Sequence, residues 1–497
     1  MRDRIILILK FLVLVLGIGI LIFIKECLPI ISGYGAKVAC SGVFVAGRNP
    51  ERVIKEDLSN FPLNLGTYTV DKADSSVTGS VWGMATRKAI YRYGLGATLV
   101  SGMTEESLRE QRIERVNPPA VNPDTMDWPM GDRVGGSGRD GERLGAVPGT
   151  DPRGGGPGLA GGVAMERDTV VDRGQEMGGG PAMDRGHKMG GGPGIDTAAL
   201  RVAVGKAFGE GSGETGTRAV IVVYHGRIVA ERYAPGFDRR TRLAGWSMTK
   251  GITNALIGIL VGQGRLNIYQ PAPVDGWQDD QRSRITMADL MHMNSGLRWW
   301  EFYGGPSDAT RMLFKEKDMG EYAMKAELRH PAGQVFNYSS GTANILSSLI
   351  RKTVGEQDYY RFPYEQLFYR TGMYSAVLEP DAGGTYVGSS YCYATARDWA
   401  RLGVLYLQDG IWNGKRILPE GWVDYTRTGE SYGALWWLNK RMRHPGIPVD
   451  CYSCEGYEGQ YIWVIPSKDL VLVRLAMEHG RRLKPDEFVP DVIGALR

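Results

Sequence analysis

The sequence predicts an α+β fold in which one antiparallel sheet is flanked by helices and carries an all-helical subdomain. Two hairpin patterns indicate the sheet, one at 219–233 and the other at 460–475. Between them, residues 247–430 carry mostly helical patterns. Because runs of strands kept apart from runs of helices favour an α+β arrangement, we expect one sheet assembled from both ends of this region.

The chain begins with a segment, residues 1–30, that is typical of a membrane anchor or a signal segment. Residues 5–24 are apolar except for Lys10, and about 20 apolar residues span a bilayer core. Arg2 and Arg4 precede this run, which favours a cytoplasmic N-terminus. Since no small-residue cleavage pattern follows soon after it, we favour an uncleaved anchor over a signal peptide. In both cases we expect the remainder to be extracytoplasmic, in the periplasm or on the cell surface of a bacterium.

A small N-terminal module is expected at 37–130, where short apolar runs alternate with turns. Strand patterns occur at 41–46 and 89–93. The following segment, 131–195, is dense in Gly, Pro, Met, Arg and Asp and contains a short repeated sequence. This composition cannot bury enough apolar surface to offset chain entropy, so we interpret the segment as a disordered insertion.

The last region, 196–497, is expected to fold as one domain. Short apolar runs separated by Gly or by a Pro-containing turn predict hairpins near both of its ends. The expected elements are strands at 219–224, 227–233, 460–465 and 470–475 and a closing helix at 486–496.

Composition argues against several classes of function. The net charge is only +4 over 497 residues, and no basic stripe with interleaved aromatic residues indicates nucleic-acid binding. Cys451 and Cys454 form one C-x-x-C pair, which lacks the two further ligands of a zinc site. A local disulfide and two free thiols are both open for this pair, while Cys40 and Cys392 are expected to be packing residues. No cofactor, metal cluster or phosphate-binding loop is expected.

The first candidate site is Ser247-Met-Thr-Lys250, which opens an apolar helical pattern. Serine is a poor nucleophile at neutral pH unless a neighbour takes its proton. Positions i and i+3 share a helix face, so Lys250 can place its amine beside the Ser247 hydroxyl. Taken alone, the four residues fit equally well a buried helix turn with an incidental lysine.

Two further patterns supply groups that such a nucleophile needs. Tyr338-Ser-Ser340 follows a Gly- and Pro-containing turn, and its phenol can pass a proton to a leaving group. Gly456 to Gln460 leads into a strand, and glycine there lets backbone N–H groups approach a reacting carbonyl. In isolation, each of these patterns is more often an ordinary turn.

In their order and spacing, the three patterns resemble those of the β-lactamase and penicillin-binding-protein superfamily. The nearest likeness is to class C β-lactamase-related serine hydrolases, the branch that holds esterases and 6-aminohexanoate-dimer hydrolases. The resemblance covers about 200–480 and includes the stretches 285–297, 394–403 and 418–422. It implies a β-lactamase/transpeptidase-like fold.

The resemblance also implies the role of each residue. Ser247 would be the acylated nucleophile, Lys250 its base and Tyr338 a proton shuttle. Ser340 would orient Lys250 or the substrate, and the backbone N–H groups of Ser247 and Gln460 would form the oxyanion hole. The implied substrate-binding and oxyanion residues are Ser340, Tyr457, Gly459 and Gln460.

The third pattern departs from that of the lactamases. Lys-Thr-Gly is absent, and a Tyr-Glu-Gly sequence beginning at Tyr457 stands in its place. The cation that would bind a β-lactam carboxylate is therefore missing, and Glu458 would repel such a group. Trp299, Trp300 and Tyr303 are candidates for aromatic walls, although such residues are also typical of a core.

The leading hypothesis is a serine hydrolase that cleaves small esters or amides through an acyl-enzyme and is held at a membrane by its N-terminal segment. A β-lactamase or peptidoglycan peptidase is one alternative, and a non-catalytic binding or scaffold protein with the same fold is another. The spacing of His292, His330 and His479 matches no Ser-His-Asp triad. The sequence indicates neither the natural substrate nor the oligomeric state.

Overall fold

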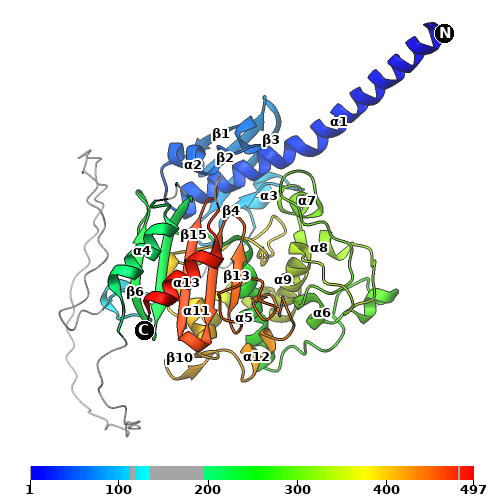
Figure 1. Ribbon diagram of the computed structural model, residues 1–497. Coiled ribbons are helices and arrows are strands. Elements are labelled where there is room, and N and C mark those ends of the chain that lie inside the picture. Colours follow the sequence, from blue (N-terminus) through cyan, green and yellow to red (C-terminus); the bar gives the residue numbers. More distant parts are fainter. Residues whose placement is uncertain are drawn as a thin grey trace, which may run out of the picture.

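A long N-terminal helix projects from a body of helices and antiparallel sheets (Figure 1). The computed structural model describes residues 2–111, 113, 119–134, 194–211, 213, 215–478 and 482–496. Most of 131–195, the segment interpreted as a disordered insertion, lies outside these residues.

The body is centred on a six-stranded antiparallel sheet with the strand order β12-β13-β14-β15-β5-β6. Strand β15 comes late in the chain and pairs with β5, so that Val471 lies opposite Val223. Both predicted hairpins are present, and the sheet is assembled from both ends of the region as expected. The strands are β5 (Thr217–Tyr224), β6 (Arg227–Tyr233), β12 (Trp437–Leu438), β13 (Tyr452–Gly456), β14 (Gln460–Ile465) and β15 (Leu470–Ala476).

Helices cover both faces of this sheet (Figure 1). On one face, α4 (Thr197–Ala207) and α13 (Pro485–Ala495) pack over the buried Trp463. Helix α13 confirms the predicted closing helix. On the other face lie α5 (Thr249–Gly262) and α11 (Ala396–Leu407), and this packing confirms the predicted α+β class.

The middle of the chain is mostly helical, as predicted, and its helices α6 to α9 lie to one side of the sheet (Figure 1). Short strands here form a three-stranded sheet, β7-β9-β8, and a separate β10-β11 hairpin. The elements are β7 (Leu243–Ala244), α6 (Met287–Met291), α7 (Asp308–Lys315), α8 (Met319–Met324), α9 (Ser340–Val354), α10 (Glu356–Tyr359), β8 (Val377–Leu378), β9 (Cys392–Ala394), β10 (Ile411–Trp412), β11 (Lys415–Arg416) and α12 (Trp422–Thr426).

The N-terminal part contains a second antiparallel sheet, in the order β1-β2-β3-β4, which packs against the first helix. The strand predicted at 89–93 is confirmed over residues 89–92, where β3 ends. The elements are α1 (Arg2–Cys40), α2 (Pro50–Asp57), β1 (Gly66–Asp71), β2 (Ser76–Val81), β3 (Met84–Arg92), β4 (Gly96–Leu99) and α3 (Glu105–Arg109).

The strand predicted at 41–46 is wrong, because this stretch continues α1 as a π-helical turn, Ser41–Val45. Its apolar residues pack within the core at the end of the helix. The short apolar run therefore reflects burial in the core and not the alternating faces of a strand. The Ser41 hydroxyl donates to the buried carboxylate of Glu379 at 3.0 Å. Lys37, one turn earlier, donates to the same carboxylate at 2.5 Å. This polar cluster joins the end of α1 to the body.

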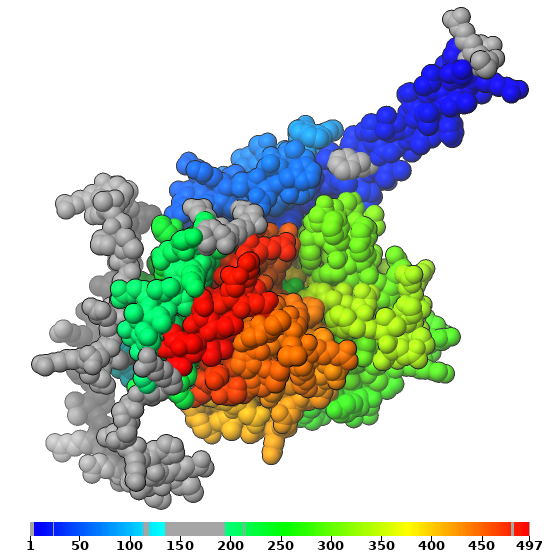
Figure 2. Space-filling model, in the orientation of Figure 1, coloured from blue at the N-terminus to red at the C-terminus, as the bar shows by residue number. Residues whose placement is uncertain are grey.

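Helix α1 changes its surroundings along its length. Its first half is exposed, with Leu7 at 68% and Leu21 at 66%, and stands clear of the body (Figure 2). Among the described residues it is the one helix long and apolar enough to cross a membrane. Residues 30–40 are buried, and a Cβ on Gly35 would lie 2.0 Å from the ring of Tyr68. The second half of α1 is therefore a core element that lies very close to the N-terminal sheet.

Candidate active site

Ser247 and Lys250 lie together, as the first pattern predicted. Ser247 belongs to a 3-10 turn, and Lys250 lies in the first turn of α5. The Lys250 Nζ donates to the Ser247 Oγ at 3.0 Å, and Lys250 is only 1% exposed. Burial lowers the pKa of Lys250 to about 8, because water no longer solvates its charge. A large fraction of the amine is therefore neutral near pH 8, as a general base must be.

The backbone at Trp246 fixes the position of the neighbouring Ser247. Trp246 has a φ of +46°, and such a conformation costs a bulky residue about 1–3 kcal/mol. Its ring packs edge-on against those of Tyr34, Tyr391 and Tyr457, at centroid distances of 5.8, 6.3 and 6.0 Å. These three contacts hold the strained residue in place.

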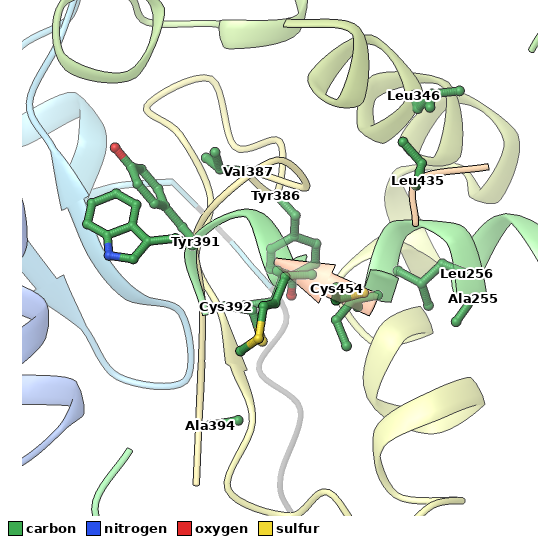
Figure 3. Packing of buried hydrophobic residues seen from close by; sticks show 14 of the residues in the cluster. Ala255, Leu256, Leu346, Tyr386, Val387, Tyr391, Cys392, Ala394, Leu435 and Cys454 are labelled. Atoms are coloured by element: carbon green, nitrogen blue, oxygen red, sulfur yellow. The ribbon is translucent and has the colours of Figure 1, made fainter. Parts of the chain in front are cut away.

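Helix α5 is fixed by close packing against β13. A Cβ on Gly251 would lie 2.5 Å from the sulfur of Cys454, so glycine permits the approach of the two elements. Cys454 lies beside α5 in Figure 3, and Leu256 and Leu435 belong to the same buried cluster. The helix that begins at the predicted nucleophile and the strand that leads to the third pattern are thus held against each other.

The second pattern converges on Lys250 from the start of α9. The Lys250 Nζ donates to the Ser340 Oγ at 3.2 Å and lies 4.9 Å from the centroid of the Tyr338 ring. Burial raises the pKa of Tyr338, the nearby Glu301 carboxylate adds to this effect, and a hydrogen bond with Ser247 opposes it. Tyr338 is therefore a neutral phenol at the Ser247 hydroxyl.

Glu301 is a residue of this cluster that the sequence analysis missed. Its carboxylate accepts hydrogen bonds from the Ser340 Oγ at 2.6 Å, the Tyr303 hydroxyl at 2.7 Å and the Trp299 Nε1 at 2.6 Å. Its negative charge favours the protonated form of Lys250. The sequence offers no signal for this role, because Glu301 is a single acid in an aromatic loop and has no fixed spacing to the three patterns.

The third pattern lies against the turn that carries Ser247. A Cβ on Gly456 would lie 2.2 Å from the carbonyl oxygen of Gly245. Gly459 has a φ of +78°, a conformation that favours glycine. The side-chain amide of Gln460 donates to backbone carbonyls, the shortest of these bonds being 2.7 Å. The start of β14 is thus held firmly beside the predicted nucleophile.

Tyr457 and Glu458, which replace the usual third motif, differ in their surroundings. Tyr457 stacks on Tyr303 at 5.0 Å and is 38% exposed, so it lines the site. Burial raises the pKa of Glu458 to about 7, and the nearby Glu478 carboxylate adds to this effect. The negative charge of Glu458 therefore forms only as the pH rises through about 7. Of the three candidates for aromatic walls, Trp300 is exposed, Tyr303 is half-buried and Trp299 is buried in the core.

The histidines and cysteines form no second catalytic arrangement in the part of the chain that the structure describes. His292 packs edge-on against Tyr425, and His479 lies outside the described residues. Cys451 and Cys454 are buried free thiols. No group of three or more His, Cys, Asp or Glu side chains among the described residues could hold a metal ion.

Comparison with known proteins agrees with this geometry. A profile described as Beta-lactamase matches residues 206–486, which is more than half of the chain. The chain belongs to the beta-lactamase family. This confirms the resemblance seen in the sequence, the β-lactamase/transpeptidase-like fold and the assignment to the serine hydrolases of this family. The matched region contains all three patterns, but it begins after α1 and the N-terminal sheet.

One relative and two solved structures are similar to this chain. The 6-aminohexanoate-dimer hydrolase of Paenarthrobacter ureafaciens is 24% identical over 297 residues, which cover 53% of this chain and 73% of that protein. A Bacillus anthracis structure provisionally given the same name is 21% identical, covers 56% of this chain and 78% of its own, and has a TM-score of 0.50. The structure of a family VIII carboxylesterase is 14% identical, and the match covers 61% of this chain and 96% of that chain, with a TM-score of 0.48.

Proposed function

We propose that this protein hydrolyses small esters or amides through an acyl-enzyme formed on Ser247. The observation that carries the proposal is the buried Lys250 amine, 3.0 Å from the Ser247 hydroxyl and with its pKa lowered to about 8. A neutral amine at this distance can remove the hydroxyl proton as Ser247 attacks a carbonyl carbon. The name of the Paenarthrobacter relative, which refers to an amide-containing dimer, supports an amide as one of the substrate classes.

The proposed reaction has two steps. In the first, Lys250 takes the proton of Ser247, the Ser247 Oγ bonds to the carbonyl carbon, and the leaving alcohol or amine departs with a proton passed on by Tyr338. The backbone N–H groups of Ser247 and Gln460 face the developing oxyanion. In the second, Lys250 takes a proton from water, whose oxygen bonds to the acyl carbon. The bond from that carbon to the Ser247 Oγ then breaks, Lys250 returns the proton to the Ser247 Oγ, and the acid is released.

Substrate choice is proposed to depend on the third pattern. The motif has no cation to bind a carboxylate, and Tyr457 lines the site instead. An unmatched charge at a partly desolvated site costs about 1–3 kcal/mol, or roughly tenfold to a hundredfold in rate. Neutral or cationic esters and amides should therefore be better substrates than β-lactams.

This preference is measured as kcat/KM for p-nitrophenyl butyrate against that for a chromogenic cephalosporin. We expect the ester to be preferred by at least about tenfold. Comparable values, or a preference for the cephalosporin, would favour the β-lactamase or peptidoglycan-peptidase alternative.

Covalent labelling tests the proposal directly. A fluorophosphonate probe should attach to the intact protein, and peptide mapping should find it on Ser247. Ser247→Ala should abolish both labelling and turnover of p-nitrophenyl butyrate, whereas Ser283→Ala, in a surface turn, should change neither. Labelling of another serine would refute the assignment, and no labelling at all would favour the non-catalytic scaffold alternative.

The cellular location is part of the same proposal. The exposed apolar half of α1 supports a membrane anchor, and the positive residues before it favour an extracytoplasmic body. A reporter enzyme fused after the last residue should be active outside the cytoplasm and remain with the membrane fraction. Release of the reporter into the soluble fraction by cleavage would favour the signal-peptide reading.

A further inference from the structure

We propose that α1 holds the active site at a fixed height above the membrane, and that the substrate is an amphiphile whose ester or amide lies on its headgroup. This inference rests on the hydrolase function proposed above and names a substrate class for the same site. Two features of the structure carry it, the rigid path from the bilayer to Ser247 and the aromatic residues around the site.

The path begins where α1 leaves the apolar run. The first charged residues after that run are Lys25 and Glu26, and burial begins at Cys27. Pro29 lies inside the helix, which nevertheless continues to Cys40 as one element. The same helix therefore leaves the bilayer and enters the enzyme core without an intervening loop.

Contacts on successive turns prevent α1 from pivoting. Glu26 forms ion pairs with Lys315 and Arg311 of α7, at 3.0 and 3.3 Å. Two turns later, Tyr34 stacks on Phe314 at a ring distance of 4.5 Å. Helix α7 follows directly after the loop that brings Glu301 to the site, so one side of the site is tied to the membrane boundary.

A second contact ties α1 to the nucleophile itself. The Tyr34 ring meets that of Trp246 edge-on at 5.8 Å, and Trp246 is bonded to Ser247. Further along α1, the buried Lys37–Glu379 ion pair anchors the helix to the body. The height of Ser247 above the bilayer is thus set by the length of α1 between Lys25 and Tyr34.

That length selects where a scissile bond must lie. Nine residues of α-helix separate Lys25 from Tyr34, which is about 14 Å along the helix axis. The headgroup layer on each side of the hydrocarbon is roughly 5–8 Å thick. With α1 along the membrane normal, Tyr34 and the neighbouring Trp246 lie beyond the headgroup layer. We therefore expect Ser247 to reach a bond carried outward on a headgroup and not a bond at the hydrocarbon boundary.

The surroundings of the site suit an amphiphile. Four exposed aromatic side chains, which we call the aromatic rim, lie beside the site residues. Phe336 packs against Tyr432, a neighbour of Tyr338. Trp300 and Phe302 stack at 5.6 Å on the outer face of the loop that turns Glu301 inward. The aromatic rim consists of Trp300 (58% exposed), Phe302 (46%), Phe336 (49%) and Tyr457 (38%).

An exposed aromatic rim around a catalytic group is a binding surface for an apolar moiety, since rings of this kind also sit well at membrane interfaces. Together with the fixed height, it favours a substrate that presents a polar, cleavable headgroup while its apolar part stays near the bilayer. A soluble ester reaches the same site from solution, and its turnover does not depend on height.

The test changes the height alone. Eleven residues of polar helix-forming sequence, inserted between Ile24 and Lys25, add about three turns and raise the site by about 16 Å. The same eleven residues inserted after Gly414, in the open turn of the β10-β11 hairpin, serve as the matched control. All proteins are full-length and reconstituted in phosphatidylcholine vesicles.

Three probes are compared. The first is phosphatidylethanolamine whose amine carries a succinyl p-nitrophenyl ester, which places the bond on the headgroup. The second is p-nitrophenyl palmitate, whose bond lies at the hydrocarbon boundary. The third is soluble p-nitrophenyl butyrate.

We expect the unmodified protein to cleave the headgroup ester at least tenfold faster than the palmitate at equal surface density. The α1 insertion should lower headgroup-ester turnover at least tenfold, while butyrate turnover stays within twofold and the control insertion changes neither. If the α1 insertion leaves headgroup-ester turnover unchanged while butyrate is still cleaved, the height inference is overturned and the hydrolase proposal stands. If no protein cleaves butyrate, both fail.

Discussion

Around Ser247, one wall is made of polar groups and the other of aromatic rings. The polar wall is Lys250, Ser340, Glu301 and Tyr338. Hydrogen bonds of 2.6–3.2 Å join Ser247, Lys250, Ser340 and Glu301, and the Tyr338 ring lies 4.9 Å from the Lys250 Nζ. The aromatic wall is a chain of ring contacts at 5.0–6.0 Å. Its members are Tyr34, Trp246, Tyr457 and Tyr303.

The two walls restrict the site to different degrees. Hydrogen bonds between buried groups fix atoms closely and set their pKa values, as burial does for Lys250. Aromatic contacts are broader in geometry and accept substrates of varied shape. Tyr303 belongs to both, since its hydroxyl donates to Glu301 while its ring stacks on Tyr457. The comparison teaches that the polar wall should control rate and the aromatic wall should control position and substrate choice.

The largest effect should come from removing the base of the polar wall. Lys250→Ala should lower kcat for p-nitrophenyl butyrate by about 10²–10⁴-fold, the usual contribution of a general base. Lys415→Ala, an exposed lysine in β11, is the matched control and should retain full activity. Equal activity of the two variants would show that the polar wall does not supply the base.

Glu301→Gln should have the next largest effect, because the Glu301 carboxylate accepts the hydrogen bond that orients the Ser340 hydroxyl. Losing a hydrogen bond to a charged group costs about 1.5–3 kcal/mol, so kcat/KM should fall roughly tenfold to a hundredfold. Glu110→Gln, at an exposed acid, is the control.

The pH profile distinguishes orientation from simple loss of structure. In the unmodified enzyme, kcat/KM should rise with pH through about 8, since Lys250 must lose its proton to act as a base. In Glu301→Gln the lysine loses a neighbouring negative charge, its pKa falls, and the rising limb should move to lower pH. A limb that stays in place, or moves to higher pH, would contradict the assigned role of Glu301.

The smallest effect should come from the aromatic wall. Tyr34→Ala removes one ring that holds Trp246, and such a contact contributes about 0.5–1.5 kcal/mol. Turnover per active site, counted by fluorophosphonate titration, should fall roughly twofold to tenfold. Tyr34→Phe should restore it, and Tyr93→Ala, at an exposed tyrosine, should have no effect. Fewer active sites with unchanged turnover would mean that Tyr34 supports folding only.

The sequence predicted the sheet and the three converging patterns because these depend on local signals. Alternating and continuous apolar runs marked the hairpins, and Ser247 and Lys250 were linked by helical spacing alone. Glu301 escaped notice because its place depends on the path of a loop that brings it to Ser340 from 39 residues away. The roles of the site residues and the interpretation of 131–195 as a disordered insertion remain predictions.

The end of α1 escaped notice for a different reason. The sequence analysis ended the apolar run at residue 24 and began a separate module at 37, whereas α1 is one helix from Arg2 to Cys40. Hydropathy does not distinguish lipid from protein as the apolar neighbour of such a helix. Only the small residues, such as Gly33 and Gly35, indicate close packing, and their meaning depends on Tyr68 and Phe314 far away in the chain. The false strand at 41–46 arose from the same ambiguity.

The ion pair between Lys37 and Glu379 has a consequence for how the protein can be prepared. Glu379 is fully buried and belongs to the segment shared with relatives, whereas Lys37 lies far outside it. Leaving one member of a buried pair without its partner costs about 3–5 kcal/mol, against a total stability of roughly 5–15 kcal/mol. A fragment limited to residues 206–486, the segment shared with the family, would keep Glu379 and lose Lys37. The segment that matches the family is therefore shorter than the segment that must fold together. A water-soluble version must retain the chain from Cys27, where burial of α1 begins.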